Sequence, residues 1–213
     1  MDEKVIKGII VERFEFRDFD LIVKLATNFG IINMLAHGVR KMTSKNIYIL
    51  NPGCLGEFEI FLDKNPNKLS KLKKGECFFN LDLSNQNIYN FWKLVSQITL
   101  ETNFVSKIFL ILEQSLTKIN SKNAESIRVY TIINWIKFNG WIANLTSCWI
   151  CKSKQRLANF DFYSGMEWAN HRTFRSFIKF SRKELEIFYW ANFDIALFLE
   201  KVDSHYIYSF LKY

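Results

Sequence analysis

The hydrophobic pattern of the chain changes its period near residue 84. Over residues 4–83 apolar side chains tend to recur at every second position, as in "VIKGIIVERFEF". That spacing is typical of strands with one buried face. Beyond this point apolar residues recur every three to four positions, which is typical of amphipathic helices. The sequence therefore predicts an α+β, multi-domain chain, with a small β domain over 1–83 and a larger helical domain over 84–213.

The first domain is expected to be a small barrel or sandwich. Strands are predicted over "VIKGIIVERFEF", on both sides of the turn Thr27 to Gly30, and over "NIYIL" and "CLGEFEIFLD". Gly30 supplies the positive φ that a tight hairpin turn requires. The lysine-rich stretch "DKNPNKLSKLKKGE" is expected to be an exposed loop. About five short, closely connected strands are typical of a small barrel or sandwich.

The second domain is expected to be helical. Helices are predicted over 84–103, 104–119, 124–142, 171–180, 182–201 and 204–213. Ser84 is the expected N-cap of the first of these helices. Ser181 with Glu184 matches a capping box, and Asp203 is the expected cap of the last helix.

A cysteine-bearing insert over 145–171 interrupts the helical pattern. Cys148 and Cys151 have the spacing of half a structural zinc site, but Trp168 and His171 stand where a second cysteine pair would be. A structural zinc ion takes four ligands, and only Cys148, Cys151 and His171 are candidates here. We therefore expect a degenerate zinc knuckle held by aromatic packing, with no cofactor, and weigh zinc binding by these three residues as the alternative. The other cysteines, Cys54 and Cys77, are expected to be small buried side chains.

Catalytic signatures are absent from the sequence. It has no nucleotide-binding glycine loop and no G-x-S-x-G nucleophile motif. We therefore expect a protein that is not an enzyme. The competing hypothesis is a thiol-dependent or metal-dependent enzyme centred on Cys148, Cys151 and His171.

The positive charge is concentrated in one region. Residues 148–183 hold eight lysines and arginines against two acidic residues, which gives this region +6 of the formal +8 of the chain. A polyanion is the natural partner of such a region. Arg172, Arg175 and Lys179 fall on one stripe of the predicted helix 171–180. This stripe suits either DNA or an acidic peptide.

The opening segment "KGIIVERFEFRDFDLIVKLATNFGIINMLAHGVRKMTSK" resembles that of the bacterial recombination mediator family RecO. The matching positions are Gly8 to Val11, Asp18 with Asp20, Thr27 to Gly30, and Gly38, Arg40, Lys41 and Ser44. Asp18 stands where the family usually has Glu, and Trp168 with His171 replaces the second cysteine pair of the family. The tail residues Ser209 to Leu211 are also similar to the end of family members.

The resemblance implies an N-terminal OB-fold barrel, followed by a helical domain with a zinc-type insert. It also implies a mediator of DNA repair and recombination that binds single-stranded and double-stranded DNA without sequence preference and anneals complementary strands. The implied protein partners are RecR, the C-terminal tail of the single-strand-binding protein and, indirectly, RecA. The third hypothesis is an RNA-binding OB protein.

Basic residues of both regions are the expected DNA contacts. Arg40, Lys41 and Lys45 are predicted on the loop after the third strand, in position to meet phosphates. The full set of predicted DNA-binding residues is Arg13, Arg17, Lys24, Arg40, Lys41, Lys45, Arg172, Arg175 and Lys179. The N-terminus lacks the apolar core of a signal peptide, and no apolar run reaches the roughly 18 residues of a membrane span. We therefore expect no membrane partner and a cytoplasmic protein associated with the bacterial nucleoid.

Overall fold

The structure, a computed structural model, describes most of the chain. The described residues are 2–44, 46–65, 68–101, 105–139, 147–148, 150–154, 157–161, 165–168, 178–179, 182–191 and 194–202. The chain forms two compact units, Met1–Ser121 and Lys122–Tyr213. The first two helices therefore belong to the same compact unit as the strands, while the division into domains at residue 84 stays a prediction.

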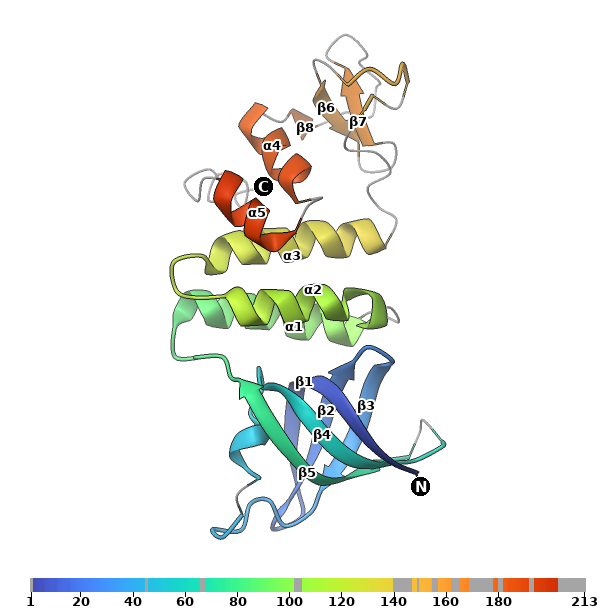
Figure 1. Ribbon diagram of the computed structural model, residues 1–213, viewed down its shortest axis with the longest axis vertical. Helices are drawn as coiled ribbons and strands as arrows, with labels where there is room; N and C mark the ends of the chain where they lie inside the picture. The colour runs from blue at the N-terminus through green and yellow to red at the C-terminus, as the bar shows by residue number, and fades with distance from the viewer. Residues whose placement is uncertain are drawn as a thin grey trace. The chain divides into compact units, whose positions relative to one another are not determined.

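The first unit contains a closed five-stranded barrel (Figure 1). Its strands are β1 (Asp2–Phe16), β2 (Asp20–Thr27), β3 (Gly30–Ala36), β4 (Leu55–Leu62) and β5 (Ser70–Phe79). They follow one another around the barrel in the order β1-β2-β3-β5-β4, with β3 and β5 parallel and the other neighbours antiparallel. This barrel is the predicted OB-fold.

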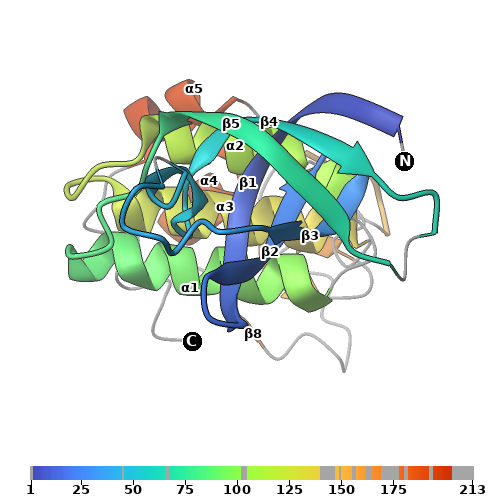
Figure 2. The same cartoon turned by 90° about the horizontal axis from the view of Figure 1, so that it is seen from below.

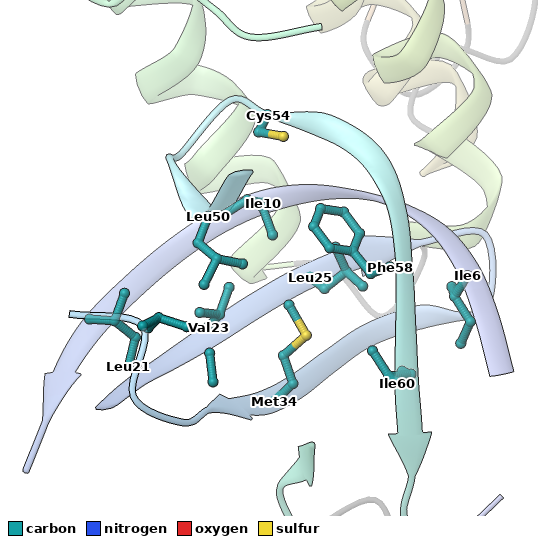
Figure 3. Close-up of a cluster of buried hydrophobic side chains, with 12 residues drawn as sticks. Ile6, Ile10, Leu21, Val23, Leu25, Met34, Leu50, Cys54, Phe58 and Ile60 are labelled. Carbon is teal, nitrogen blue, oxygen red and sulfur yellow. The ribbon is translucent and has the colours of Figure 1, made fainter. Parts of the chain in front are cut away.

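Alternating side chains of the strands fill the barrel. Leu21, Val23 and Leu25 of β2 are buried and point into the same core as Phe58 of β4 (Figure 3). Burial of each such side chain contributes about 1.5–3 kcal/mol relative to exposure. The period of two in the sequence thus has its origin in one filled barrel interior.

The lysine-rich stretch before residue 77 was predicted to be an exposed loop, and this prediction was wrong for β5. Ser70 is buried and Leu72 is partly buried, while the lysines between and beyond them face solvent. β5 runs close beside β4, where a Cβ on Gly56 would collide with the carbonyl oxygen of Glu76. The pattern of alternating apolar residues missed β5, because its inward-facing residues are mostly small and its outward-facing residues are mostly polar.

The segment "NIYIL" was predicted to be a strand, but it forms the 3-10 helix η1 (Tyr48–Leu50). Leu50 is the residue of η1 that is fully buried in the barrel core, whereas Tyr48 is 76% exposed. After η1 the backbone joins β1, since Gly53 N donates to Ile10 O and Ile10 N donates to Cys54 O.

Two helices, α1 (Gln86–Glu101) and α2 (Val105–Lys118), complete the described part of the first unit. Both were predicted. α1 contacts β1, and α2 contacts β2 and β3. An ion pair joins Lys7 of β1 to Glu113 of α2 at 2.5 Å. The predicted cap Ser84 was wrong by one residue, because the side chain of Asn85 accepts the hydrogen bonds from Asn87 N and Ile88 N.

The second unit combines helices with a small sheet. Its described elements are α3 (Ala124–Phe138), β6 (Leu157–Asp161), β7 (Gly165–Trp168), β8 (Ile178–Lys179), α4 (Arg182–Trp190) and α5 (Ile195–Lys201). The strands pair in the order β7-β6-β8. α5 packs on α3, where the rings of Tyr130 and Phe198 lie 5.2 Å apart.

Two helix predictions in the second unit were wrong. The helix predicted over 171–180 is contradicted at Ile178–Lys179, which form β8, and residues 171–177 lie outside the described part of the chain. The helix predicted over 182–201 is two helices, because Asp194 caps α5 by accepting from Ala196 N and Leu197 N. The predicted caps Ser181 and Asp203 lie outside the described residues. Among the helices that are described, none is long and apolar enough to cross a membrane.

Candidate nucleic-acid interface

The β1–β2 turn and the segment after β3 meet at one end of the barrel. Asp20 Oδ1 accepts a hydrogen bond from Gly38 N at 2.8 Å, and Asp20 Oδ2 lies 3.2 Å from His37 Nδ1. The backbone N of Arg40 donates to Phe19 O at 3.0 Å. Figure 1 shows this end of the barrel turned away from α1 and α2, and Figure 2 looks onto it. Asp20 therefore fastens together two segments that both carry predicted DNA-binding residues.

The Asp20 carboxylate is held in its charged form. Its pKa lies below the ordinary value, first because of the hydrogen bond from Gly38 N–H, and then because of the His37 ring and the positive charge of Arg17, while partial burial opposes the shift. A carboxylate that accepts backbone N–H bonds prefers the ionised state. The anchor is thus complete at neutral pH.

A shallow cleft of about 480 Å³ opens at this anchor. Its lining residues are Arg17, Asp18, Phe19, Asp20, His37, Gly38 and Lys41. Acidic side chains share the cleft with the cations, so its charge is mixed. The cleft suits contact with a phosphate at its basic rim better than enclosure of a small anion.

Two predicted cations of this end lie over aromatic rings. The guanidinium of Arg17 is 5.0 Å from the ring centre of Phe16, and Lys41 Nζ is 5.7 Å from that of Phe19. Over the described ranges, neither Arg17 nor Lys41 has an acidic partner within 4 Å. Arg17 also has a positive φ of 53° in the β1–β2 turn. Among the predicted cations that the structure describes, these two are therefore the most available to a phosphate backbone.

The other predicted cations that the structure describes in the barrel have polar partners. Arg40 pairs with Glu15 at 3.0 Å, and Lys24 pairs with Glu12 at 2.9 Å. Arg13 is held differently, because its Nη1 donates to Asn51 Oδ1 at 2.7 Å. A phosphate would have to compete with the two glutamates for Arg40 and Lys24.

The remaining predicted cations cannot be placed in this way. Lys45, Arg172 and Arg175 lie outside the described residues, and for Lys179 the structure describes the backbone in β8. Their role in DNA binding stays a prediction.

Several residues of this surface were not predicted from the sequence. Phe14 is 48% exposed and Phe19 is 50% exposed, and each has a lysine over its ring. Glu12 and Glu15, which pair with predicted cations, were also missed. The signal was present in β1, where charged and aromatic residues alternate from Arg13 onward, but only the strand register shows which of them meet.

The cysteine pair lies on a tight turn. Cys148 N donates to Ser153 O, and Lys152 N donates to Cys148 O, both at 2.8 Å. Lys152, directly after Cys151, has a positive φ of 60°. The described residues thus offer zinc two thiols and contain no group of three metal-ligating side chains, while the third candidate His171 lies outside them. The absence of zinc stays a prediction. Cys148 is fully buried, which does not suit an accessible nucleophile.

Comparison with known proteins agrees with the fold. The family models described as "Recombination protein O N terminal" and "Recombination protein O C terminal" match residues 1–80 and 90–186. A relative named "DNA repair protein RecO" from Mycoplasma capricolum is 36% identical over 160 residues, which is 71% of this chain and 64% of the relative. Relatives of the same name from Mycoplasma mycoides and Mesoplasma florum are 32% and 28% identical, with 64% and 62% of their length covered. The chain thus matches somewhat less than two thirds of the length of these relatives. Matches to both halves confirm the predicted family: the chain belongs to the recombination protein O family.

Proposed function

We propose that the protein is a DNA-binding mediator of repair and recombination that works without catalysing a reaction. The observation that carries the proposal is the OB barrel with Arg17 and Lys41 at its open end, beside exposed phenylalanines. OB-folds bind oligonucleotides on such surfaces, with cations on the phosphates and aromatic rings on the bases. The name of the relatives, DNA repair protein RecO, supports the same role.

The mechanism we propose is annealing by charge neutralisation. Two complementary strands repel each other through their phosphates, and a basic protein that displaces their counterions lowers this barrier. Arg17, Arg40 and Lys41 would contact phosphates at the barrel end, with no chemistry on the DNA itself. The bases then remain free to pair with the second strand.

Its partners are proposed from the family. The protein would act with RecR on strands that are coated with the single-strand-binding protein and so help to load RecA. Residues 148–183, with their net charge of +6, would either extend the DNA contact or receive the acidic tail of the single-strand-binding protein.

The test is annealing of two complementary labelled oligonucleotides coated with single-strand-binding protein, followed across a salt series. We expect the protein to accelerate annealing at low salt and to lose this effect as salt rises, because binding by counterion release weakens steeply with salt. Acceleration by the Arg40→Ala, Lys41→Ala double variant should be weaker at an unchanged melting temperature. If the protein neither binds DNA nor accelerates annealing at low salt, the proposed function is wrong.

A further inference from the structure

The outer face of the barrel carries a row of side chains across four strands, next to the cleft. The strand register pairs Phe14 with Ile22, Ile22 with Leu35, and Leu35 with Lys71. Directly paired residues of neighbouring strands project from the same face of a sheet. Phe14, Ile22, Leu35 and Lys71 therefore form one continuous row, which we call the outer row.

The outer row is open to solvent. Phe14 is 48% exposed, and Ile22 and Leu35 are partly exposed, whereas their neighbours Leu21 and Val23 are buried in the barrel core. α2 contacts β2 and β3 as well. The ion pair of Glu12 and Lys24 lies next to the row, and both of its side chains are about one third exposed or less. A contiguous exposed apolar strip is a feature of binding surfaces.

Positive charges border the outer row. Lys24 Nζ lies 5.4 Å from the ring centre of Phe14, and Lys71 ends the row on β5. In the β1–β2 turn that follows Phe14 along the chain, Arg17 lies over Phe16, and Lys41 lies over Phe19 of the same turn. Planar apolar groups on a polyanionic chain fit such a surface, with the planar groups on the rings and the anions on the cations.

We propose that the outer row is a stacking site for the unpaired bases of single-stranded DNA, and that Phe14 makes the protein prefer single strands to duplex. The inference rests on the proposed function, because it names the strand type that the same barrel selects. A base inside a duplex has both faces covered by its neighbours, so only an unstacked base offers a face to Phe14. The cations, in contrast, attract the phosphates of either form.

The experiment compares Phe14→Leu with the wild-type protein in binding a labelled oligothymidylate and a duplex of the same length. Leucine keeps an apolar side chain on β1 but removes the aromatic face. Loss of one base–aromatic stack is worth about 1–3 kcal/mol, so we expect single-strand affinity to fall by about fivefold or more. Duplex affinity should change by less than about twofold.

Two further variants separate stacking from other effects. Phe29→Leu is the matched control, because Phe29 is 79% exposed in the β2–β3 turn and lies outside the row. It should leave both affinities unchanged. Phe14→Tyr keeps the ring and should keep the single-strand preference.

The outcomes distinguish the inference from the function on which it rests. If the wild-type protein binds both DNA forms and Phe14→Leu weakens neither, or weakens both equally, the stacking site is overturned while DNA binding stands. A Phe14→Leu protein that binds DNA normally but loses an acidic peptide would assign the row to peptide instead. If the wild-type protein binds neither DNA form at low salt, both the inference and the proposed function are wrong.

Discussion

Glu15 holds Arg40, a cation that the barrel would otherwise offer to a phosphate. The glutamate is 75% exposed and its carboxylate lies 3.0 Å from Arg40 Nη2. Removal of one negative charge about 6 Å from a phosphate is worth about 0.7 kcal/mol in water, roughly a threefold change in affinity. We therefore expect Glu15→Gln to bind DNA about threefold more tightly at low salt, as measured by fluorescence anisotropy.

A second glutamine variant controls for net charge. Glu76→Gln removes the same charge from β5, where Glu76 lies opposite Glu57 of β4 in the strand register. We expect a smaller gain from this change, and the gain of Glu15→Gln should fade as salt screens the charges. Equal gains from both variants would show that only net charge matters, and that Glu15 does not compete with phosphate for Arg40.

The Asp20 anchor predicts a pH dependence of stability. Because the pKa of folded Asp20 lies below its ordinary value, the carboxylate stabilises the fold fully above the ordinary value and loses this effect as pH falls through the folded pKa. Asp20→Asn should therefore have a lower melting temperature than wild type at pH 7, and the difference should shrink towards pH 3. Thermal unfolding followed by circular dichroism from pH 7 to pH 3 measures both quantities.

Asp18→Asn is the control for this prediction. Asp18 lines the same cleft, and no hydrogen bond of its carboxylate is found among the described residues. Its variant should melt close to wild type at every pH. A constant gap between Asp20→Asn and wild type down to pH 3 would contradict the anchor as an ionised group.

At the scale of elements, the start of α1 depends on Asn85. Its side chain accepts hydrogen bonds from Asn87 N at 3.1 Å and Ile88 N at 3.3 Å, which leaves fewer unpaired N–H groups in the first turn. Asn85→Ala should lower the free energy of unfolding by about 1 kcal/mol in urea titrations. Ser84→Ala should cost less, because the Ser84 hydroxyl donates to Asp82 Oδ1 and does not cap the helix. A larger loss of unfolding free energy from Ser84→Ala than from Asn85→Ala would show that Ser84 is the cap.

The elements that could be predicted from the sequence are those with a one-sided apolar pattern. β2 and α1 have such a pattern because each buries one face, and both were predicted. β5 has lysines on its outer face and mostly small residues on its inner face, so its sequence lacks the alternating apolar pattern that predicts a strand. The helix predicted over 182–201 looked continuous because its apolar spacing persists, but Asp194 caps a separate helix within that range.

Part of the candidate site could also be predicted from the sequence. Basic residues on the barrel could be found as residue types, and Arg17, Arg40 and Lys41 do meet at one end of it. Their partners could not be found, because Glu15 becomes a neighbour of Arg40 only after a turn and two strands bring residues 25 positions apart together. The outer row could not be predicted, because it is defined by the register of four strands and the sequence does not specify this register.

For the molecule as a whole, the salt dependence of DNA binding can show whether both units contact DNA. The slope of log affinity against log salt falls by about 0.7 for each single-strand phosphate contact that is removed. The Arg40→Ala, Lys41→Ala variant changes the first unit, and a triple alanine variant at Arg172, Arg175 and Lys179 changes the second. If both units contact DNA, each variant should lower the slope and their combination should lower it by the sum. If the second unit instead receives an acidic peptide, the triple variant should keep the slope of wild type and lose binding of a labelled acidic peptide.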